Sequence, residues 1–417
     1  MAGISAGNTN NVQPQDVQIN NRFALISLTS LFFIWGLITS LNDILIPHLK
    51  GVFELTYTQA MLVQFCFFSA YFLVSIPAGR LIQKSGYQLG IFIGLVTAAV
   101  GCLIFIPSAQ IPAYWMFLGA LFILASGITI LQVAANPLVT LMGKPETASA
   151  RLNMTQAFNS LGATAGPIVG GILIFGGTHG ADGASVDKVI VPYLGLAVIL
   201  IALGIYFKMI HIPDTHTTEA SDAEVPANDS IWRHKHLILG AIGIFTYVGA
   251  EVSIGSFLVS YLGEANIGNM SEAQAANYVA YFWGGALIGR FIGAALMSYI
   301  AANKILAFNG AMSILLLAAT MSFDGAIAMW SVIAVGLCNS IMFPTIFSLA
   351  IKKLGPLTSQ GSGLLCLAIV GGAVIPLCQG VLADTIGIQA SFVLPLVCYV
   401  YIAFFGFKGF KPRGTEY

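Results

Sequence analysis

The chain has 417 residues, of which 57% are hydrophobic and only 8% are charged, with a mean hydropathy of +0.86. A soluble domain carries about 25% charged residues, so this composition excludes an ordinary water-soluble domain and predicts an all-α integral membrane protein. The formal net charge is zero, which gives no basis for binding nucleic acid. The six cysteines lie inside apolar runs without metal-ligand spacing and are predicted to be small core residues.

Twelve apolar runs are long enough to cross a bilayer, which takes about 20 residues. The predicted spans are 22–47, 58–82, 87–107, 113–142, 150–177, 190–210, 237–263, 274–300, 304–323, 325–351, 359–384 and 389–410. A polar, acidic stretch separates the sixth span from the seventh and is predicted to be a linker. The predicted parts are a tail (1–21), an N-terminal half (22–210), the linker (211–236), a C-terminal half (237–410) and a second tail (411–417).

The basic residues orient these spans. Of the 17 Lys and Arg residues, all except Lys50 and Lys188 fall on the same side of the membrane as the N-terminus. Lys and Arg accumulate on the cytoplasmic side. Both termini and the linker are therefore predicted to be cytoplasmic, with the chain in the inner (plasma) membrane.

The first span carries polar side chains where hydrocarbon contacts are expected. One helix face about 100° wide holds Trp35, Thr39, Asn42 and Asp43. A carboxylate at the centre of a membrane helix costs about 2.5–3.5 kcal/mol even on the most lenient scale. A partner, a cation, a proton or a water-filled cavity must compensate for that cost. The alternative is that Asp43 simply ends the helix, four residues before Pro47.

The second half of the sequence repeats the first with a shift of about 208 residues. Three features recur in register: Gly79-Arg80 as Gly289-Arg290, Pro137 as Pro344, and Pro167 as Pro376. The same shift places Asp43 on Glu251, so two acids occupy matching positions in the two halves. Paired six-helix repeats with a site between them are typical of secondary transporters. Asp43 and Glu251 are therefore predicted to be coupling residues.

Glycines and cations gather near the ends of the second and eighth spans. Glycines let helices approach closely, and cations there can hydrogen-bond neighbouring helix ends in one conformation. The alternative for Lys84 is that it serves only as a cytoplasmic anchor. The residues predicted to act in conformational change are Gly79, Arg80, Lys84, Gly289 and Arg290.

Further polar residues within the spans predict an internal cavity. Gln132 and Asn136 share a helix face, and Gln156 follows in the next span. Amides and a carboxylate suit sugar hydroxyls and an indole suits C–H faces, although each amide could instead link two helices. No Lys or Arg is expected inside, so the substrate is predicted to be neutral. The predicted substrate-binding residues are Trp35, Asn42, Gln132, Asn136, Gln156, Trp283 and Asn339, with Phe343 as a further aromatic candidate.

Four segments carry a resemblance to a known family: SLNDILIP, AANPLVTLMG, RLNMTQAFNSLGA and FPTIFSLAIKKLG. They resemble the fucose/galactose/glucose symporter family of the major facilitator superfamily, over nearly the whole chain. The resemblance implies the major facilitator fold, with Asp43 as a coupling acid and the amides and Trp35 lining the cavity. In the fucose branch a glutamate stands at Gln132 and a glutamine at Glu251. The seventh span is instead similar to the glucose/galactose branch, some members of which use sodium.

These features predict a cation-coupled symporter that imports a neutral hexose such as glucose or galactose by alternating access. The alternatives are a proton-coupled symporter of fucose or an N-acetylhexosamine, and a non-transporting sugar receptor derived from a transporter. The coupling ion is Na⁺ or H⁺, with Asp43 and Glu251 as possible Na⁺ ligands, and no other cofactor is expected. The expected partners are a neutral monosaccharide, a monovalent cation and the lipid bilayer, with the protein as a monomer. The sequence shows neither a catalytic set nor a GxxxxGK[ST] loop, which argues against an enzyme or a nucleotide-driven pump.

Overall fold

The computed structural model describes residues 22–40, 57–110, 114–170, 190–210, 212 and 229–412. These residues are almost entirely helical, because a backbone in hydrocarbon has no water to bond and must satisfy its own N–H and C=O groups. The helices of the N-terminal half are a first helix, Arg22–Ser40, then α2 (Tyr57–Ser85), α3 (Tyr87–Gln110), α4 (Tyr114–Leu141), α5 (Ala148–Gly170) and α6 (Ile190–Met209).

The C-terminal half begins with three long helices and continues with spans that are built from several pieces. The long helices are α7 (Lys235–Gly263), α8 (Glu272–Leu296) and α9 (Ala302–Ser322). The pieces are α10 (Gly325–Asn339), α11 (Met342–Ala350), α12 (Thr358–Leu367), α13 (Gly371–Ile386), α14 (Ile388–Ser391) and α15 (Val393–Phe404), which runs into a π-helical turn, Phe405–Gly409. Short 3-10 turns lie at Pro145–Thr147, Ile231–Arg233, Gly355–Leu357 and Ala368–Val370.

The predicted all-α membrane architecture is confirmed. Within the described residues, 11 helices are long and apolar enough to cross a membrane. The twelfth span is α5, whose polar face lowers its hydropathy. The predicted linker lies mostly outside the described residues.

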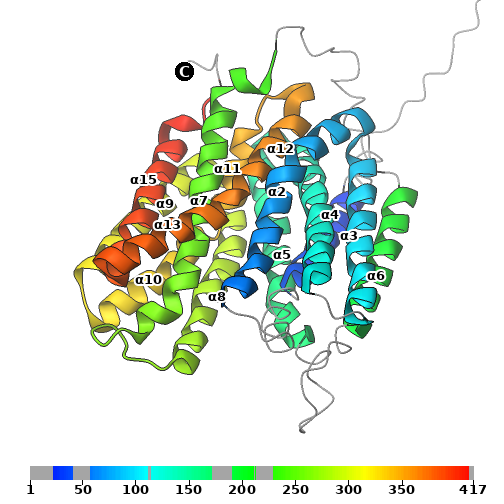
Figure 1. The fold of residues 1–417 in the computed structure, drawn as a ribbon. Coiled ribbons are helices and arrows are strands. Elements are labelled where there is room, and N and C mark those ends of the chain that lie inside the picture. Colours follow the sequence, from blue (N-terminus) through cyan, green and yellow to red (C-terminus); the bar gives the residue numbers. More distant parts are fainter. Residues whose placement is uncertain are drawn as a thin grey trace, which may run out of the picture.

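The two halves repeat the same helix packing side by side (Figure 1). In the first half α2 packs on α4, and α3 packs on both α4 and α6. In the second half the corresponding helices pair in the same way, with α8 on α10 and α9 on both α10 and α15. The arrangement is therefore two pseudo-symmetric six-helix units.

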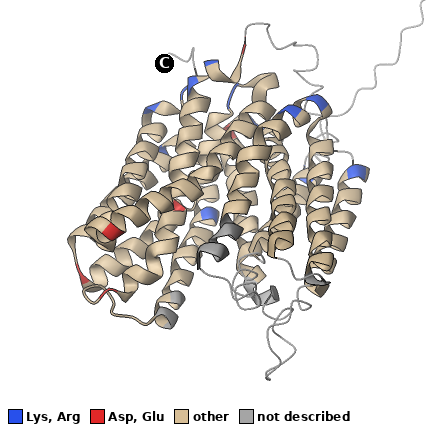
Figure 2. Ribbon diagram, viewed as in Figure 1, with Lys and Arg blue, Asp and Glu red and all other residues tan. Residues whose placement is uncertain are grey.

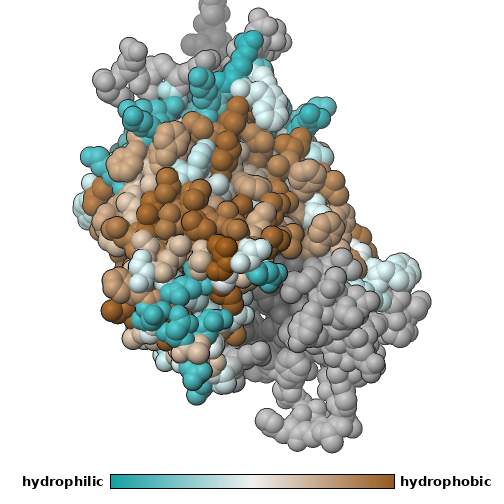
Figure 3. Space-filling view, turned by 60° about the vertical axis from the view of Figure 1, so that its left-hand side comes forward, coloured by the Kyte–Doolittle hydropathy of each residue, from teal (hydrophilic) through white to brown (hydrophobic). Residues whose placement is uncertain are grey.

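The surface and the charges show how the molecule lies in a bilayer. Figure 3 shows a broad hydrophobic belt between two hydrophilic ends. Nearly all of the Lys and Arg residues in Figure 2 gather at one end, which also holds the described C-terminal residues. We call this the basic end. The exposed Glu264 and Asp324 lie at the other ends of the helices, where α7 ends and α10 begins. The belt therefore faces lipid, and the two ends face water.

The halves meet closely near the basic end. Here α2 packs on α12, and α5 packs on α8 and α11. A Cβ atom added to Gly79 would lie 2.8 Å from the carbonyl oxygen of Ser359, so only glycine fits this crossing. The hydroxyls of Ser149 and Ser348, from opposite halves, lie 2.7 Å apart. The conformation is therefore closed between the halves at the basic end.

Candidate functional site

A cavity of about 210 Å³ lies between the two halves. The first helix, α2, α4 and α5 supply one side of it, and α7, α8 and α11 supply most of the other. Its walls combine aromatic, amide and charged side chains. The lining residues are Trp35, Thr39, Tyr71, Gln132, Gln156, Asn159, Tyr247, Val248, Glu251, Arg290, Phe343 and Ile369.

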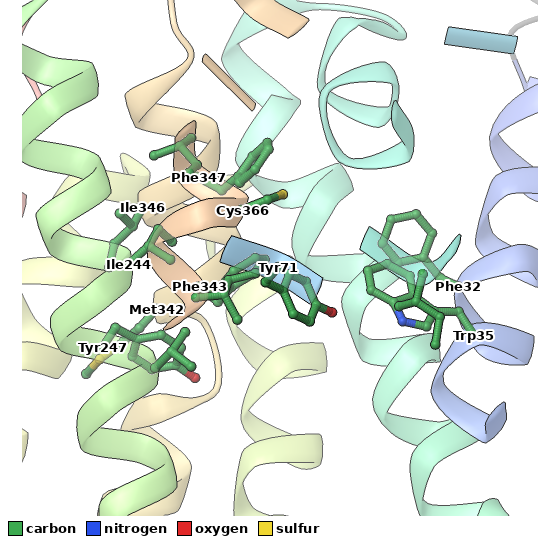
Figure 4. Packing of buried hydrophobic residues seen from close by; sticks show 14 of the residues in the cluster. Phe32, Trp35, Tyr71, Ile244, Tyr247, Met342, Phe343, Ile346, Phe347 and Cys366 are labelled. Atoms are coloured by element: carbon green, nitrogen blue, oxygen red, sulfur yellow. The ribbon is translucent and has the colours of Figure 1, made fainter. Parts of the chain in front are cut away.

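Aromatic rings from four helices form part of the wall. Trp35 packs on Phe32 with ring centroids 5.2 Å apart, and is itself almost fully buried. In the view of Figure 4, Tyr71 and Phe343 lie between Trp35 on one side and Tyr247 on the other. Aromatic side chains commonly line binding pockets. The flat apolar faces of these rings suit the C–H surfaces of a sugar ring.

Three amides come from α4 and α5. Gln132 and Gln156 line the cavity, and the Gln156 Nε2 donates to the Oδ1 of Asn136 at 3.3 Å. The buried Oε1 of Gln132 has no hydrogen-bond partner in the described chain, nor has the Nδ2 of Asn136. A buried amide atom without a partner costs about 1–3 kcal/mol. These unsatisfied groups therefore indicate a polar ligand or water at this wall.

The C-terminal half contributes one acid and one base to the lining. Glu251 interacts electrostatically with the Arg290 guanidinium, and Tyr247 lines the same cavity beside them. Among the described residues Glu251 and Arg290 form no direct ion pair, and the buried Oε1 of Glu251 has no partner. Each charge offsets part of the cost of burying the other, and a polar group placed between them could bond both.

Arg290 is held in place by a break in the neighbouring helix. Pro344 lacks an N–H, so it leaves the carbonyl oxygen of Ser340 without its helical donor. The Arg290 Nε donates to that oxygen at 3.0 Å. The prediction that no Lys or Arg lies inside the cavity was wrong, because Arg290 is part of the lining. Arg290 lies six residues before the end of α8, roughly 9 Å below it at 1.5 Å per residue, rather than at the basic end.

Comparison with known proteins places this architecture in a family. A family model described as the Major Facilitator Superfamily matches residues 27–366. The chain belongs to this superfamily. It is 59% identical to a glucose/galactose transporter of Brucella abortus, covering 94% of this chain and 96% of that protein. It is 34% identical to the L-fucose-proton symporter of Escherichia coli over 92% of each. The solved structure of FucP, a Major Facilitator Superfamily transporter in the outward conformation, matches with a TM-score of 0.87 and 32% identity, over 94% of this chain and 99% of that one.

The predicted site residues of this major facilitator protein fall into three groups. Trp35, Gln132, Gln156, Glu251 and the further candidate Phe343 are brought together in the cavity lining. Asn42 and Asp43 lie outside the described residues. The others stand apart from the lining: they are Asn136, Asn339 and Trp283.

The positions of these last three residues have separate physical reasons. Asn136 lies behind Gln156, to which it is bonded. Asn339 is fully buried, with its Oδ1 accepting from the Tyr399 hydroxyl at 2.6 Å and its carbonyl accepting from Tyr247. Trp283 lies near Gly255 and is 44% exposed. Asn136 and Asn339 thus support the walls.

The residues predicted to act in conformational change are also dispersed. Gly79 lies at the contact between the halves, and Gly289 packs close to Ser340, whose Oγ would lie 2.5 Å from an added Cβ. Arg80 and Lys84 are exposed at the basic end, whereas Arg290 lines the cavity. The repeated Gly-Arg pair therefore has two different surroundings in the two halves of this major facilitator fold.

Sequence reasoning missed several lining residues. Tyr71, Asn159 and Tyr247 were not singled out, because tyrosines and amides in apolar spans look the same whether they pack or line a cavity. Asn159 had a usable signal, since it lies three residues after Gln156 and so on nearly the same helix face. Its Nδ2 donates to the carbonyl of Phe32 at 3.0 Å, which fastens α5 to the first helix beside Trp35.

Proposed function

We propose that this protein imports a neutral hexose of the glucose or galactose class together with a monovalent cation. The observation that carries the proposal is the cavity between the halves, where amides and aromatic rings accompany one acid and one base. The identity to a protein named glucose/galactose transporter supports the same substrate class. The described charges of the lining, Glu251 and Arg290, sum to zero when both are ionised. A neutral polyol suits such a lining better than a sugar phosphate does.

The hydroxyls of the sugar would find both donors and acceptors. Gln132 offers its unpartnered Oε1, and Gln156 and Asn159 lie on the next helix. Opposite them, the Arg290 guanidinium donates and Glu251 Oε1 accepts. The rings of Trp35 and Phe343 would flank the C–H faces of the sugar. Because the contacts come from both halves, sugar binding would favour a conformation in which the halves approach each other around it.

The direction of access follows from the basic end. If that end is cytoplasmic, as the positive-inside rule predicts, the contacts between Gly79 and Ser359 and between Ser149 and Ser348 close the cytoplasmic side. The conformation then corresponds to the outward-facing stage of a transport cycle. The match to FucP in the outward conformation supports this assignment. We place the protein in the inner membrane as a monomer with both termini cytoplasmic.

The two candidate coupling ions make different demands on the site. A proton would neutralise Glu251 and weaken its attraction for Arg290. A sodium ion would need several oxygen ligands and would be repelled by Arg290. Such a site would combine the carboxylate of Asp43 or Glu251 with amide and backbone oxygens. The name of the L-fucose-proton symporter supports the proton, and the similarity of the seventh span to the glucose/galactose branch supports sodium.

Counterflow in proteoliposomes tests the substrate. Vesicles loaded with unlabelled glucose should accumulate labelled glucose transiently, and galactose should compete. Strong competition by glucose 6-phosphate, or no competition by any neutral monosaccharide, would overturn the proposal. Preferred competition by fucose or N-acetylglucosamine would favour the alternative substrates. Sugar binding without any counterflow would identify a receptor instead of a transporter.

Concentrative uptake tests the coupling ion separately. Vesicles are given either an inward Na⁺ gradient at equal pH or an inward proton gradient without Na⁺, with the membrane potential clamped to zero. Accumulation in only one of the two conditions identifies the ion. Equilibration without accumulation in both would show a facilitator and remove the symport proposal while leaving the substrate assignment intact.

A further inference from the structure

A second cavity, of about 430 Å³, lies at the basic end. We call it the basic-end groove. It is lined by both halves and by the segment that precedes α7: its residues are Ile76, Arg80, Ser230, Ile231, Trp232, Gln360, Leu364 and Leu367. None of them lines the central cavity, so sugar binding does not account for the groove.

Arg80 is the charged residue among the described residues that line this groove. It is exposed, and it makes no hydrogen bond or ion pair within the described chain. By contrast, Arg151 at the same end donates to the carbonyl oxygens of Thr140 at 2.8 Å and Lys144 at 2.9 Å. Asp229, the acid beside Ser230, is engaged by His234 at 3.1 Å. The Arg80 guanidinium is therefore available to a ligand that carries negative charge.

The groove changes from polar to apolar along the helices. Ile76 lies one turn deeper in α2 than Arg80, and Leu364 and Leu367 lie one and two turns deeper in α12 than Gln360. Trp232 stands at the water-facing end and is 63% exposed. Indoles favour the level of the lipid headgroups. The ligand therefore needs an anionic head and an apolar tail that reaches towards the membrane interior.

We propose that the basic-end groove binds one anionic phospholipid. Arg80 binds the phosphate, since a guanidinium matches phosphate oxygens with two parallel N–H donors. Ile76, Leu364 and Leu367 hold the first part of an acyl chain, and Trp232 covers the glycerol region. Basic pockets between helices at the cytoplasmic surface are known to take such lipid headgroups.

The lipid also has a conformational consequence. Ile76 and Arg80 belong to one half, Gln360 and Leu364 belong to the other, and Ser230 to Trp232 lead into α7. Separation of the basic ends would take this lining apart. The bound lipid therefore stabilises the closed basic end, because a ligand shifts an equilibrium towards the state that binds it more tightly.

Native mass spectrometry of the purified full chain tests the site. The protein is titrated with dioleoylphosphatidylglycerol, and in parallel with dioleoylphosphatidylcholine. We expect the first phosphatidylglycerol to bind more tightly than further phosphatidylglycerol molecules and more tightly than phosphatidylcholine. Arg80→Gln should weaken the binding of this first phosphatidylglycerol by about five-fold. Lys144→Gln removes an exposed cation from the same end without touching the groove, and should leave the event unchanged. Equal weakening by both variants would mean general surface charge and would overturn the site.

A second variant keeps the charge and fills the groove. Ile76→Trp leaves Arg80 in place but occupies the acyl part, so it should also lose the tight phosphatidylglycerol event. Thermal unfolding of each variant shows that it is folded. Undiminished binding in both Arg80→Gln and Ile76→Trp, or equal binding of phosphatidylcholine by the unmodified protein, would refute the proposal.

Discussion

Two repeat-related prolines, Pro137 in α4 and Pro344 in α11, produce different local structures. Each removes the helical donor of the carbonyl four residues before it. The helix continues through Pro137, and the free carbonyl of Val133 accepts from the buried Ser362 hydroxyl at 2.9 Å. Before Pro344 the helix breaks, with α10 ending at Asn339 and α11 beginning at Met342.

The break exposes three successive carbonyls to side-chain donors. Cys338 accepts from Asn309 at 3.0 Å, Asn339 accepts from Tyr247 at 3.1 Å, and Ser340 accepts from Arg290 at 3.0 Å. Tyr247 and Arg290 also line the cavity together with Glu251. The C-terminal half therefore fastens Arg290 to the backbone of a broken helix, whereas the described part of the N-terminal half lines the cavity with neutral amides. We infer that the lining of the C-terminal half governs coupling to the cation, and that the lining of the N-terminal half governs affinity for the sugar.

Arg290→Gln should have one of the two largest effects on concentrative uptake. It leaves Glu251 without its compensating charge and weakens the bond to the Ser340 carbonyl. Hydrogen bonds to charged groups contribute about 1.5–3 kcal/mol, so we expect concentrative uptake to fall by roughly a hundred-fold. Uptake in proteoliposomes measures it, with the exposed Lys304→Gln of α9 as a charge-matched control. Near-normal accumulation by Arg290→Gln would show that the break in the helix has no role in coupling.

Glu251→Gln should abolish concentrative uptake while exchange of labelled for unlabelled sugar continues. The substitution keeps the side-chain size but removes the group that a coupling ion would neutralise. Glu264→Gln, at the exposed end of the same helix, is the control.

The double variant Glu251→Gln with Arg290→Gln should unfold at a higher temperature than Arg290→Gln alone, since neither charge is then left unpaired. Accumulation by Glu251→Gln would move the coupling site to Asp43 alone.

Gln132→Ala and Gln156→Ala should have a smaller and different effect. Each removes a neutral hydrogen-bonding group from the lining, which is worth about 1 kcal/mol and thus roughly five-fold in sugar affinity. The ion dependence of uptake should not change. Gln88→Ala serves as the control, because Gln88 bonds the carbonyls of Phe207 and Ile210 and lies outside the cavity. A loss of accumulation with unchanged affinity would contradict the division of roles between the halves.

The spans could be predicted from the sequence because hydrocarbon imposes one solution on the backbone. The predicted limits of α4 and α7, for example, agree with the structure within two residues. The spacing of Gln132, Asn136 and Gln156 likewise placed them together, although only the glutamines reach the cavity. Helical periodicity fixes which residues lie on the same face of a helix. It does not fix the distance between that face and the neighbouring helix.

The surroundings of Arg290 could not be read from the sequence for a similar reason. A rule based on Lys and Arg counts treats each cation as a marker of a helix end. In α8 the helix continues for six residues beyond Arg290, and the oxygen that holds its guanidinium belongs to a residue 50 positions later. The proline that frees that oxygen was visible in the repeat, but its donor is chosen by packing between helices.

Ser362→Ala should have the smallest effect and tests the N-terminal side of the comparison. The Ser362 hydroxyl and the Val133 carbonyl belong to opposite halves, so their bond exists only while the basic ends are together. Loss of a buried hydrogen bond costs about 1 kcal/mol, which should raise the population with separated basic ends by about five-fold. In a variant whose native cysteines are replaced, spin labels are attached to cysteines introduced in place of Lys144 and Lys304. The distances between these labels report that population. Ser253→Ala removes a buried hydroxyl that has no partner in the described chain and should leave the distances unchanged. If Ser362→Ala also leaves them unchanged, Pro137 serves the packing of α4 alone and only Pro344 is linked to the transport cycle.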